Sequence, residues 1–480
     1  MEVLETASPT VVPLLQEPNS LVICEKDVRD LLQRQKVRKA PGADGVTPFC
    51  LKVCAAQLAP ILTRIFNSSL ELCSVPTCLK TSTITPVPKK ASISGLNDYR
   101  PIALTSVVMK VFERLVLTHL KDITDPLLDP LQFAYRPNRS VDDAVNMAMH
   151  YILQHLDSSG SYARVLFVDF SSAFNTIVPS KLYLKLIQLK VPISVCKWIH
   201  SFLINRKQQV RLGKITSNIR TISIGAPQGC VLSPLLFSLY TNDCISTNPS
   251  VKILKFADDT TVIGLIKNGD ESAYRQEVEH LVAWCNSNSL VLNPQKTVEM
   301  VVDFRKHPPC ILPLSVLGST VSVVESFRFL GSVLSWDLKW STNIDGIIKK
   351  AHQRLYFLRQ LRKFNLPREL LVQFYRGIIE SVLCSSITVW FGSATKLDKN
   401  RLQRTVRIAG KIIRADLPSM EELYIARVKK RAEKIAADPR HPGHNLFNLL
   451  PSGRRYKTLY TKTSRHKNSF FPCAIKLLNL

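Results

Sequence analysis

The stretch KILKFADDTTVIG, residues 252–264, decides the fold. Two apolar segments flank the adjacent carboxylates Asp258 and Asp259, and residues 256–263 contain no Lys or Arg. This pattern predicts two strands joined by a turn that carries the carboxylates. Neighbouring negative charges in a partly buried hairpin repel each other and resist loss of hydration. Favoured two-residue turns use Asn-Gly or Asp-Gly, so turn chemistry alone explains this pair poorly.

A divalent cation would resolve this repulsion, because Mg²⁺ prefers carboxylate oxygens and keeps positions open for phosphates. A third carboxylate, Asp169, follows four consecutive apolar residues in RVLFVDF (164–170), which predict a buried central strand. Asp169 precedes Asp258 by 89 positions, so only the fold can bring them together. Three carboxylates at neighbouring strand ends suit two-metal phosphoryl transfer. This spacing alone does not separate a polymerase from a nuclease or a cyclase.

The net charge predicts a polyanionic partner. The chain has 480 residues and a charge of +27, and residues 336–480 hold 29 Lys and Arg against 10 Asp and Glu, which gives them +19. Interspersed apolar and aromatic residues favour a folded nucleic-acid surface over a disordered tail or an acidic membrane as partner. No apolar run reaches the ~18 residues of a membrane span, and residues 1–10 lack the pattern of a secretory leader. We therefore expect an intracellular protein.

Local patterns predict the elements of the N-terminal part. Residues 25–46 begin as an amphipathic helix that their Pro-Gly pair must end. A second helix is expected from Val107, behind a capping hydroxyl of Thr105 or Ser106. Between them, residues 83–106 are extended and interrupted by prolines, with short strands at best.

The central and C-terminal parts differ in character. Residues 225–240 predict a glycine- and proline-rich loop that runs into a helix capped by Ser233, and residues 297–304 predict a strand. From Thr342, basic helices dominate. One face of the first of them carries Ile344, Ile347, Ile348, Ala351, Leu355 and Leu358. The aromatic residues expected in the core of this helical part are Tyr356, Phe357, Phe374 and Tyr375.

Several motifs occur in a fixed order along the chain. They are KAPGADGV (39–46), YRPIALTS (99–106), FVDFSSAFNTI (167–177), GAPQGCVLSPLLFSLYTND (225–243), FADD (256–259), LNPQKT (292–297) and FRFLGS (327–332). In this order they resemble the reverse transcriptase of non-LTR retrotransposons, the long interspersed element type. The resemblance covers residues 39–334, and ordered blocks are more specific than a single motif. The basic helical remainder is similar to the region that follows the polymerase in such elements.

The resemblance implies roles for residues of the catalytic centre. Asp169, Asp258 and Asp259 match the metal-binding aspartates of the polymerase palm, which implies two Mg²⁺ ions, with Mn²⁺ as an alternative. Lys296 matches a lysine that protonates the leaving pyrophosphate. The turn that holds the primer end is matched by Phe329, Leu330 and Gly331.

The resemblance also implies a nucleotide-binding set. Phe174, five residues after Asp169, matches the bulky residue that packs under the incoming sugar and excludes a 2′-hydroxyl. Lys89 and Arg100 match basic residues of the fingers that grip the triphosphate, although the adjacent Lys90 leaves the choice of lysine open. The loop that contacts nucleotide and template is matched by Gln228 and Gly229.

The implied fold is an α+β right-hand polymerase with an antiparallel palm sheet. Its predicted parts are a lead-in helix in residues 1–38, fingers and palm in 39–335, a thumb-like helical region in 336–440 and a basic tail in 441–480. The implied activity is RNA-directed DNA synthesis, with an RNA template, a DNA primer or target DNA, and dNTPs as partners. The implied location is the nucleus, the cytoplasm or both, as a ribonucleoprotein.

The sequence departs from the family pattern in two ways. Asn175 stands where an Asp is common, and about 40 residues precede the polymerase motifs, too few for an upstream endonuclease domain. We therefore expect a fragment or truncated copy without endonuclease activity, and we find no residue set typical of an RNase H. The alternative functions are a catalytically inactive nucleic-acid-binding remnant, an intron-encoded maturase, or an RNA-dependent RNA polymerase, which the bulky Phe174 disfavours.

Overall fold

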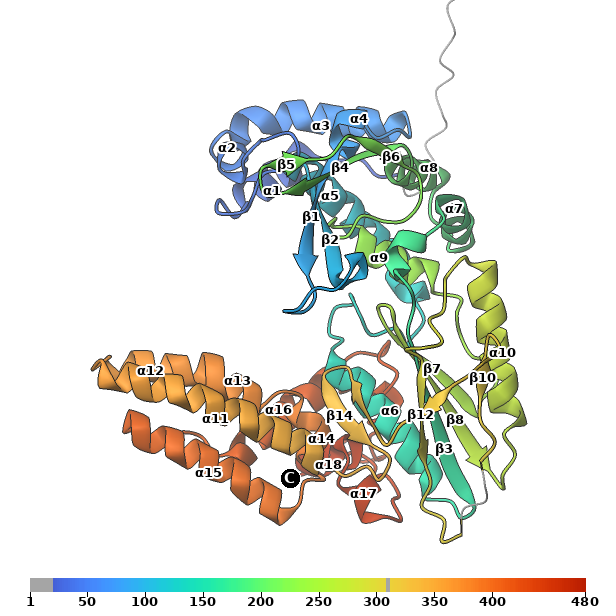
Figure 1. The fold of residues 1–480 in the computed structure, drawn as a ribbon, viewed down its shortest axis with the longest axis vertical. Coiled ribbons are helices and arrows are strands. Elements are labelled where there is room, and N and C mark those ends of the chain that lie inside the picture. Colours follow the sequence, from blue (N-terminus) through green and yellow to red (C-terminus); the bar gives the residue numbers. More distant parts are fainter. Residues whose placement is uncertain (1–19, 308–310) are drawn as a thin grey trace, which may run out of the picture. The chain divides into compact units, whose positions relative to one another are not determined.

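The computed structural model describes residues 20–307 and 311–480, which form two compact units (Figure 1). Unit 1 comprises residues 20–127 and 174–240, and unit 2 comprises residues 128–173 and the rest of the described chain from 241. The N-terminal residues 1–10, in which no secretory leader pattern was found, lie outside the described residues. Within the described ranges, no helix combines the length and the apolar character that crossing a membrane requires.

Unit 1 is a helical cluster packed on a small mixed sheet. Its helices are α1 (Glu25–Gln33), α2 (Pro48–Val53), α3 (Ala55–Glu71), α4 (Thr77–Lys80), η1 (Leu96–Asp98), α5 (Val107–Thr124), η2 (Asp125–Leu127), α7 (Pro179–Gln188), α8 (Ile193–Leu203) and α9 (Ser233–Tyr240). Its strands are β1 (Ser82–Pro88), β2 (Tyr99–Thr105), β4 (Arg206–Leu212), β5 (Ile215–Thr216) and β6 (Arg220–Ile222). Phe112 of α5 joins three helices, because its ring stacks on Phe66 at 4.3 Å and meets Trp198 edge-on at 4.8 Å.

Three expectations for unit 1 can be compared with the structure. The helix from Val107 is confirmed, and the Ser106 hydroxyl caps it by accepting from the Met109 N–H. The first helix ends at Gln33, earlier than expected, because the polar residues that follow offer no apolar face. Residues 83–106 form more than short strands, since β1 and β2 pair antiparallel over seven residues each. The prolines are tolerated because β2 is an edge strand and β1 has its second neighbour, β4, only at residues 82–84.

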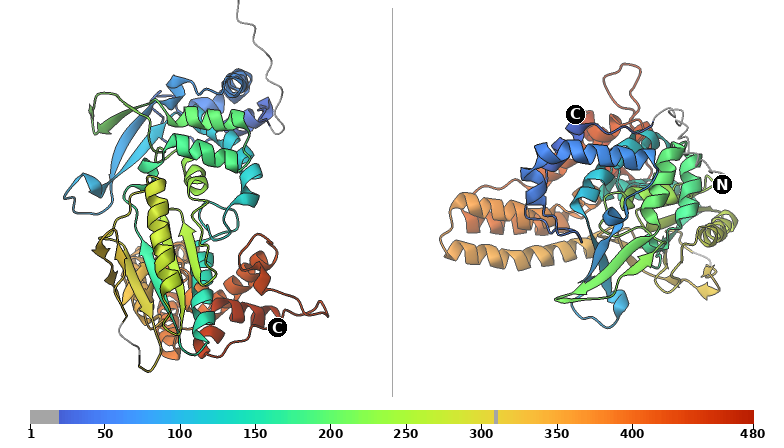
Figure 2. Two further views of the ribbon diagram at one scale, coloured as in Figure 1. Left: turned by 90° about the vertical axis from the view of Figure 1, so that its right-hand side faces the viewer. Right: turned by 90° about the horizontal axis from the view of Figure 1, so that it is seen from above.

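Unit 2 is built around a five-stranded sheet with the strand order β12-β9-β3-β8-β7. Its strands are β3 (Ser161–Val168), β7 (Val251–Phe256), β8 (Asp259–Lys267), β9 (Val298–Val302) and β12 (Ser322–Val323). The apolar run before Asp169 forms β3, which is central and buried at all eight positions, as predicted. Helix α6 (Val141–Leu156) covers one face of this sheet and α10 (Ser272–Ser287) covers the other (Figure 2).

The rest of unit 2 consists of short hairpins followed by helices. The hairpin strands are β10 (Ser315–Val316), β11 (Ser319–Thr320), β13 (Ser326–Phe329) and β14 (Ser332–Ser335). The helices are α11 (Ser341–Lys363), α12 (Arg368–Phe374), the π-helix η4 (Tyr375–Glu380), α13 (Ser381–Leu383), α14 (Ile387–Trp390), α15 (Lys396–Ile413), α16 (Met420–Ala436), η5 (His444–Leu446), α17 (Ser464–Lys467) and α18 (Phe470–Leu478). All six residues of the predicted apolar face of α11 are buried.

Residues 441–480 were expected to form a tail, but the structure packs them into the core of unit 2. Phe470 and Phe471 of α18 are buried in the same apolar cluster as the helices before them. The Asp157 carboxylate, just after α6, accepts from the Thr463 N–H at 3.2 Å and contacts His466 Nδ1 at 2.7 Å. This segment is therefore an integral part of unit 2.

Candidate active site

The turn between β7 and β8 carries the two adjacent carboxylates. The strands pair up to Phe256 and Asp259, so Ala257 and Asp258 form a two-residue turn and Asp259 begins β8. Ala257 adopts a left-handed conformation with φ +58°, which costs a residue with a side chain about 1 kcal/mol. The Gln132 side chain accepts a hydrogen bond from the Ala257 N–H at 3.3 Å and so supports this turn.

Asp169 reaches the same edge of the sheet from the neighbouring strand. Strand β3 pairs antiparallel with β8, and its last pair is Val168 with Thr260. The same register, continued by one residue, sets Asp169 opposite Asp259. Opposite residues of antiparallel strands lie about 5 Å apart. Strand pairing thus brings together aspartates that are far apart in the sequence.

The electrostatics of the site reflect this convergence. The side chains of Asp258 and Asp259 reach solvent, yet surrounding protein atoms displace part of their hydration. This loss of hydration, together with the charges of Asp258 and Asp169, raises the pKa of Asp259 to about 6. Loss of hydration and the Asp169 charge also raise the pKa of Asp258. The site is a concentration of uncompensated negative charge.

The segment LNPQKT runs beside the end of β3 and brings Lys296 to Asp169. The Asn293 N–H donates to the Asp169 carbonyl at 2.9 Å, and the Asp169 N–H donates to the Thr297 hydroxyl at 3.3 Å. Lys296 Nζ lies 3.9 Å from Asp169 Oδ2, and the lysine side chain is 71% exposed. This long, exposed ion pair leaves most of the local negative charge uncompensated.

Two residues of this edge were missed in the sequence. Gln132 is buried and supports the turn, and Tyr135 lies near the aspartates, since burial and the charges of Asp258 and Asp259 raise the pKa of its hydroxyl. Both belong to the segment before α6, which has the composition of an ordinary loop. The sequence feature that could have drawn attention to this segment is FAYRPNRS (133–140), which mixes aromatic, basic and turn-forming residues.

The donor set fits hard divalent cations. Three carboxylates supply only oxygen ligands, and the raised pKa values of Asp258 and Asp259 show a local demand for positive charge. Across residues 20–307 and 311–480, no three or more His, Cys, Asp or Glu side chains are arranged so that they could hold a metal ion by themselves, and this includes the three aspartates. Mg²⁺ ions of phosphoryl-transfer enzymes are usually held by one or two carboxylates plus water and substrate phosphates. An open arrangement of this kind suits ions that arrive with a nucleotide.

The basic residues predicted to bind a triphosphate lie in unit 1, on β2 and in the connection between β1 and β2. Arg100 is an exposed residue of β2, paired with Val87. Lys90 Nζ forms an ion pair with Asp98 at 2.9 Å, whereas Lys89 Nζ donates to a backbone carbonyl, that of Asn97, at 2.8 Å. The Ser94 N–H and the Lys90 ammonium hold the pKa of Asp98 well below its usual range. The positive charge of Lys90 is therefore compensated and that of Lys89 is not.

Phe174, Gln228 and Gly229 also lie in unit 1. The Phe174 ring, within η3 (Ala173–Thr176), is half-buried and stacks on Phe237 of α9 at 4.8 Å. Gly229 has φ +115°, and a Cβ there would lie 2.8 Å from the Ala103 carbonyl oxygen, so only glycine fits. The structure begins α9 at Ser233 itself, so the helix starts at the residue that was predicted to cap it, one residue earlier than expected.

The predicted primer-binding turn is a tight hairpin in unit 2. Strands β13 and β14 pair up to Phe329 and Ser332, so Leu330 and Gly331 form the turn. Both have positive φ, +47° and +94°, as in the hairpin turns that match the twist of the strands. The ring of Phe329 is buried against Phe167 of β3 at 5.4 Å, which ties the hairpin to the strand that leads to Asp169.

Comparison with known proteins identifies the family. The family model described as "Reverse transcriptase (RNA-dependent DNA polymerase)" matches residues 87–334, slightly more than half of the chain. The chain belongs to the reverse transcriptase family. A second model, described as "Alkylated DNA repair protein alkB homolog 8, N-terminal", matches the short segment 340–381.

Relatives of this reverse transcriptase are proteins of mobile elements. It is 27% identical to the probable RNA-directed DNA polymerase from transposon BS of Drosophila melanogaster, over 83% of this chain and 45% of that protein. It is 26% identical to the RNA-directed DNA polymerase from mobile element jockey of the same organism, over 80% of this chain and 43% of that protein. The chain thus spans less than half the length of these relatives. A solved structure of telomerase from Candida albicans is 13% identical, with a TM-score of 0.40 over 77% of this chain and 67% of that chain.

These findings confirm the resemblance to the non-LTR reverse transcriptases that the ordered motifs indicated. The α+β right-hand polymerase class is confirmed as well, and reverse transcriptases generally depend on divalent metal ions. The roles of individual site residues, the division into fingers, palm and thumb, and the effect of Asn175 stay predictions.

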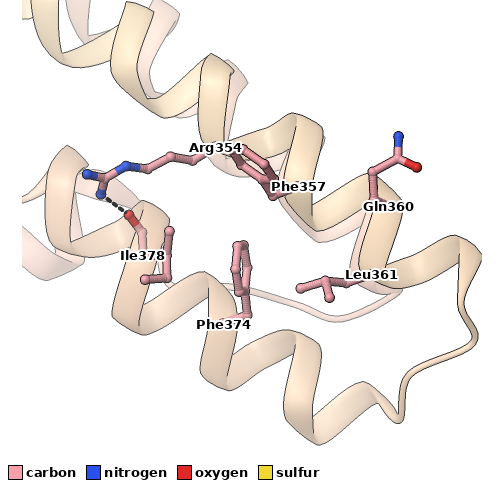
Figure 3. Close-up of a pocket in the computed structure, with 6 residues that line it drawn as sticks. All are labelled: Arg354, Phe357, Gln360, Leu361, Phe374 and Ile378. Atoms are coloured by element: carbon pink, nitrogen blue, oxygen red, sulfur yellow. Dashed lines mark hydrogen bonds between the residues drawn. The ribbon is translucent and has the colours of Figure 1, made fainter.

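The basic helical part of this reverse transcriptase exposes aromatic residues that were expected in its core. Tyr375 is buried as predicted, but Tyr356 and Phe357 are 56% and 57% exposed. The prediction was wrong for these two because they follow the buried Leu355 by 100° and 200° around the helix. Phe357 instead lines an open pocket of about 440 Å³ between α11 and the α12–η4 segment, facing Phe374 (Figure 3). Basic residues accompany it, with Lys349, Lys350 and Arg359 exposed on α11.

Proposed function

We propose that this chain is an RNA-directed DNA polymerase of a non-LTR retrotransposon, which extends a DNA primer on an RNA template by metal-assisted nucleotidyl transfer. The observation that supports this most directly is the convergence of Asp169, Asp258 and Asp259 at one edge of an apolar sheet, in a chain of the reverse transcriptase family. Two Mg²⁺ ions, for which Mn²⁺ can substitute, would supply activation of the primer hydroxyl and neutralisation of the triphosphate.

The residues of unit 2 would perform the catalytic roles. The carboxylates of Asp169, Asp258 and Asp259 would hold the ions. Lys296 carries an exposed ammonium group beside Asp169 and would donate a proton to the departing pyrophosphate. The primer end would rest on the turn formed by Phe329, Leu330 and Gly331.

The residues of unit 1 would bind the incoming nucleotide. Arg100 and Lys89 would grip the triphosphate, and Lys89 is a better candidate than Lys90 because Asp98 compensates the charge of Lys90. Phe174 would pack under the sugar and exclude a 2′-hydroxyl. Nucleotide and template would be contacted by Gln228 and Gly229.

The remaining assignments follow the charge and the element order. Residues 39–335 would form fingers and palm, preceded by a lead-in segment in 1–38. The thumb-like residues 336–440, together with 441–480, would bind the primer–template through their excess of +19. The working location would be a ribonucleoprotein in the nucleus or the cytoplasm.

The test is primer extension on an RNA template with dNTPs or NTPs. We expect Mg²⁺-dependent incorporation of dNTPs that EDTA stops, and we expect Asp169→Asn and Asp258→Asn to abolish it without loss of folding. Asp270→Asn is the matched control, because Asp270 lies beyond the far end of β8 and is bonded to Ser272. Template binding without synthesis by the wild-type chain would favour an inactive remnant, and preferential use of NTPs would favour an RNA polymerase.

A further inference from the structure

Glu113 is an acidic residue of α5 that none of the motifs above singles out. Its side chain is fully buried. Loss of hydration raises the pKa of this carboxyl to about 7. A carboxyl group in an apolar interior is costly unless its hydrogen bonds offset the lost hydration. Its partners therefore indicate what it does.

The partners of Glu113 are two consecutive backbone N–H groups. Its Oε2 accepts from the Val231 N–H at 2.6 Å and from the Leu232 N–H at 2.9 Å. These groups directly precede α9, at the end of the helix where unpaired N–H groups gather and negative charge is favourable. Glu113 thus anchors the last part of the loop that leads into α9.

Further hydrogen bonds fix the rest of this loop, residues 225–233. The Ala226 N–H donates to the Phe174 carbonyl at 2.8 Å, and the Gln228 carbonyl accepts from the Ala103 N–H at 2.7 Å. The Ser233 hydroxyl donates back to the Pro227 carbonyl at 2.7 Å. Six of the nine loop residues are buried, and those that reach solvent are Gln228, Gly229 and Val231. The loop therefore presents the two residues that match the family's nucleotide-contacting motif.

We propose that Glu113 is a positioning residue for nucleotide binding: by accepting both N–H groups, it holds Gln228 and Gly229 in the conformation that contacts the incoming nucleotide. This inference rests on the proposed function. Glu113 acts through the loop and does not itself touch substrate or metal. A purely structural residue would stabilise the fold without a selective effect on nucleotide affinity.

Three substitutions of Glu113 test separately its hydrogen-bond acceptor, its negative charge and its side-chain volume. Glu113→Gln keeps an oxygen of the same reach. Glu113→Asp keeps the charge but is one methylene shorter, so it cannot reach both N–H groups. Glu113→Met fills the space without an acceptor. The matched control is Glu277→Met, because Glu277 is a buried acid of α10 that accepts from the Thr247 N–H at 3.3 Å and lies outside the proposed machinery.

The readouts are KM and kcat for a single dNTP, the Kd for primer–template and the thermal midpoint. We expect Glu113→Asp and Glu113→Met to raise KM for the dNTP at least about tenfold, while the Kd for primer–template changes less than about twofold. Glu113→Gln is expected to stay within about threefold of the wild-type KM. Glu277→Met is expected to lower the thermal midpoint and leave KM unchanged.

An unchanged KM in Glu113→Asp overturns the inference, as does an equal rise in Glu277→Met or in Glu113→Gln. In each of these cases DNA synthesis by the wild-type chain still upholds the proposed function. Lack of synthesis by the wild-type chain overturns both. If Glu113→Met fails to fold, the comparison of Glu113→Asp with Glu113→Gln decides.

Discussion

Asp259→Asn is expected to make the metal-free protein more stable and to abolish DNA synthesis. The pKa of Asp259 is raised from 3.8 to about 6, so the native protein binds a proton more tightly than the unfolded chain. The contribution of Asp259 to stability is therefore lost as the pH rises from about 4 to about 6, and it stays lost above that range. Asparagine carries no charge to be penalised, so the variant should keep the stability that the wild type loses.

The size of the effect follows from the pKa shift. A shift of about 2 units corresponds to about 3 kcal/mol for a fully buried group. The Asp259 side chain reaches solvent, and screening reduces the expected gain to about 1 kcal/mol. For a chain of this size, that gain raises the thermal midpoint by about 1 °C.

The assay is thermal unfolding in EDTA at pH 7.5 and at pH 4, with primer extension in parallel. The gain should appear at pH 7.5 and disappear at pH 4, where both proteins are neutral at this position. Asp270→Asn is the control with the opposite sign, because hydrogen bonds from Ser272 lower the pKa of Asp270, and it should keep full synthesis. A lower midpoint for Asp259→Asn at pH 7.5, or synthesis that survives the substitution, would refute the assignment of the site.

Phe174→Ala should admit ribonucleotides while dNTP use persists, and an unchanged dNTP/NTP selectivity would leave Phe174 a packing residue. Replacing the exposed Lys349, Lys350 and Arg359 with Gln should reduce the log–log salt slope of primer–template binding by about 2 to 3, whereas an unchanged slope would mean that these charges are only solvated. Gly229→Ala should raise KM for dNTPs at least about tenfold, because the alanine Cβ would lie 2.8 Å from a carbonyl oxygen, and a normal KM would contradict this.

The elements that the sequence predicted well are those with local burial patterns. Strand β3 is buried on both faces and appears as consecutive apolar residues, and α11 repeats its apolar residues at helical spacing. The pairing of β1 with β2 was underestimated because proline content is local, whereas the edge position that tolerates proline depends on which strands become neighbours.

The division at residue 335 shows another limit of local patterns. The sequence changes character near Trp336, yet Phe167 of the sheet and Ile344 of α11 belong to one apolar cluster. A change in composition marks a change of secondary structure, whereas a compact unit depends on which faces become buried together. Truncation after Ser335 would expose this shared core, so neutralising surface cations tests nucleic-acid binding more cleanly.

The sequence pointed to the charged residues of the candidate site but not to the residues that hold its turn and loop in place. Asp169, Asp258 and Asp259 stand out because carboxylates are unusual beside apolar strands. Gln132 supports the catalytic turn from 125 residues away by a bond to a backbone N–H. Glu113 anchors its loop in the same way across 118 residues. Such contacts produce no residue spacing or composition that could be recognised in the sequence, because nearly every residue has the same backbone N–H group.

The sheet of unit 2 also shows why the aspartate edge calls for a cation. Arg164 lies fully buried on β3, only five residues before Asp169. Its charge is compensated by Glu299 of β9 at 2.5 Å and by Glu271, the residue before α10, at 2.6 Å. Within the described part of the chain, Asp258 and Asp259 have no ion pair of this kind, and the turn that joins them to β7 contains a left-handed alanine. A fold that compensates a buried charge so completely at one end of a strand, and leaves three carboxylates with a single long, exposed ion pair at the other, can gain the missing positive charge from ions that bind with the substrate.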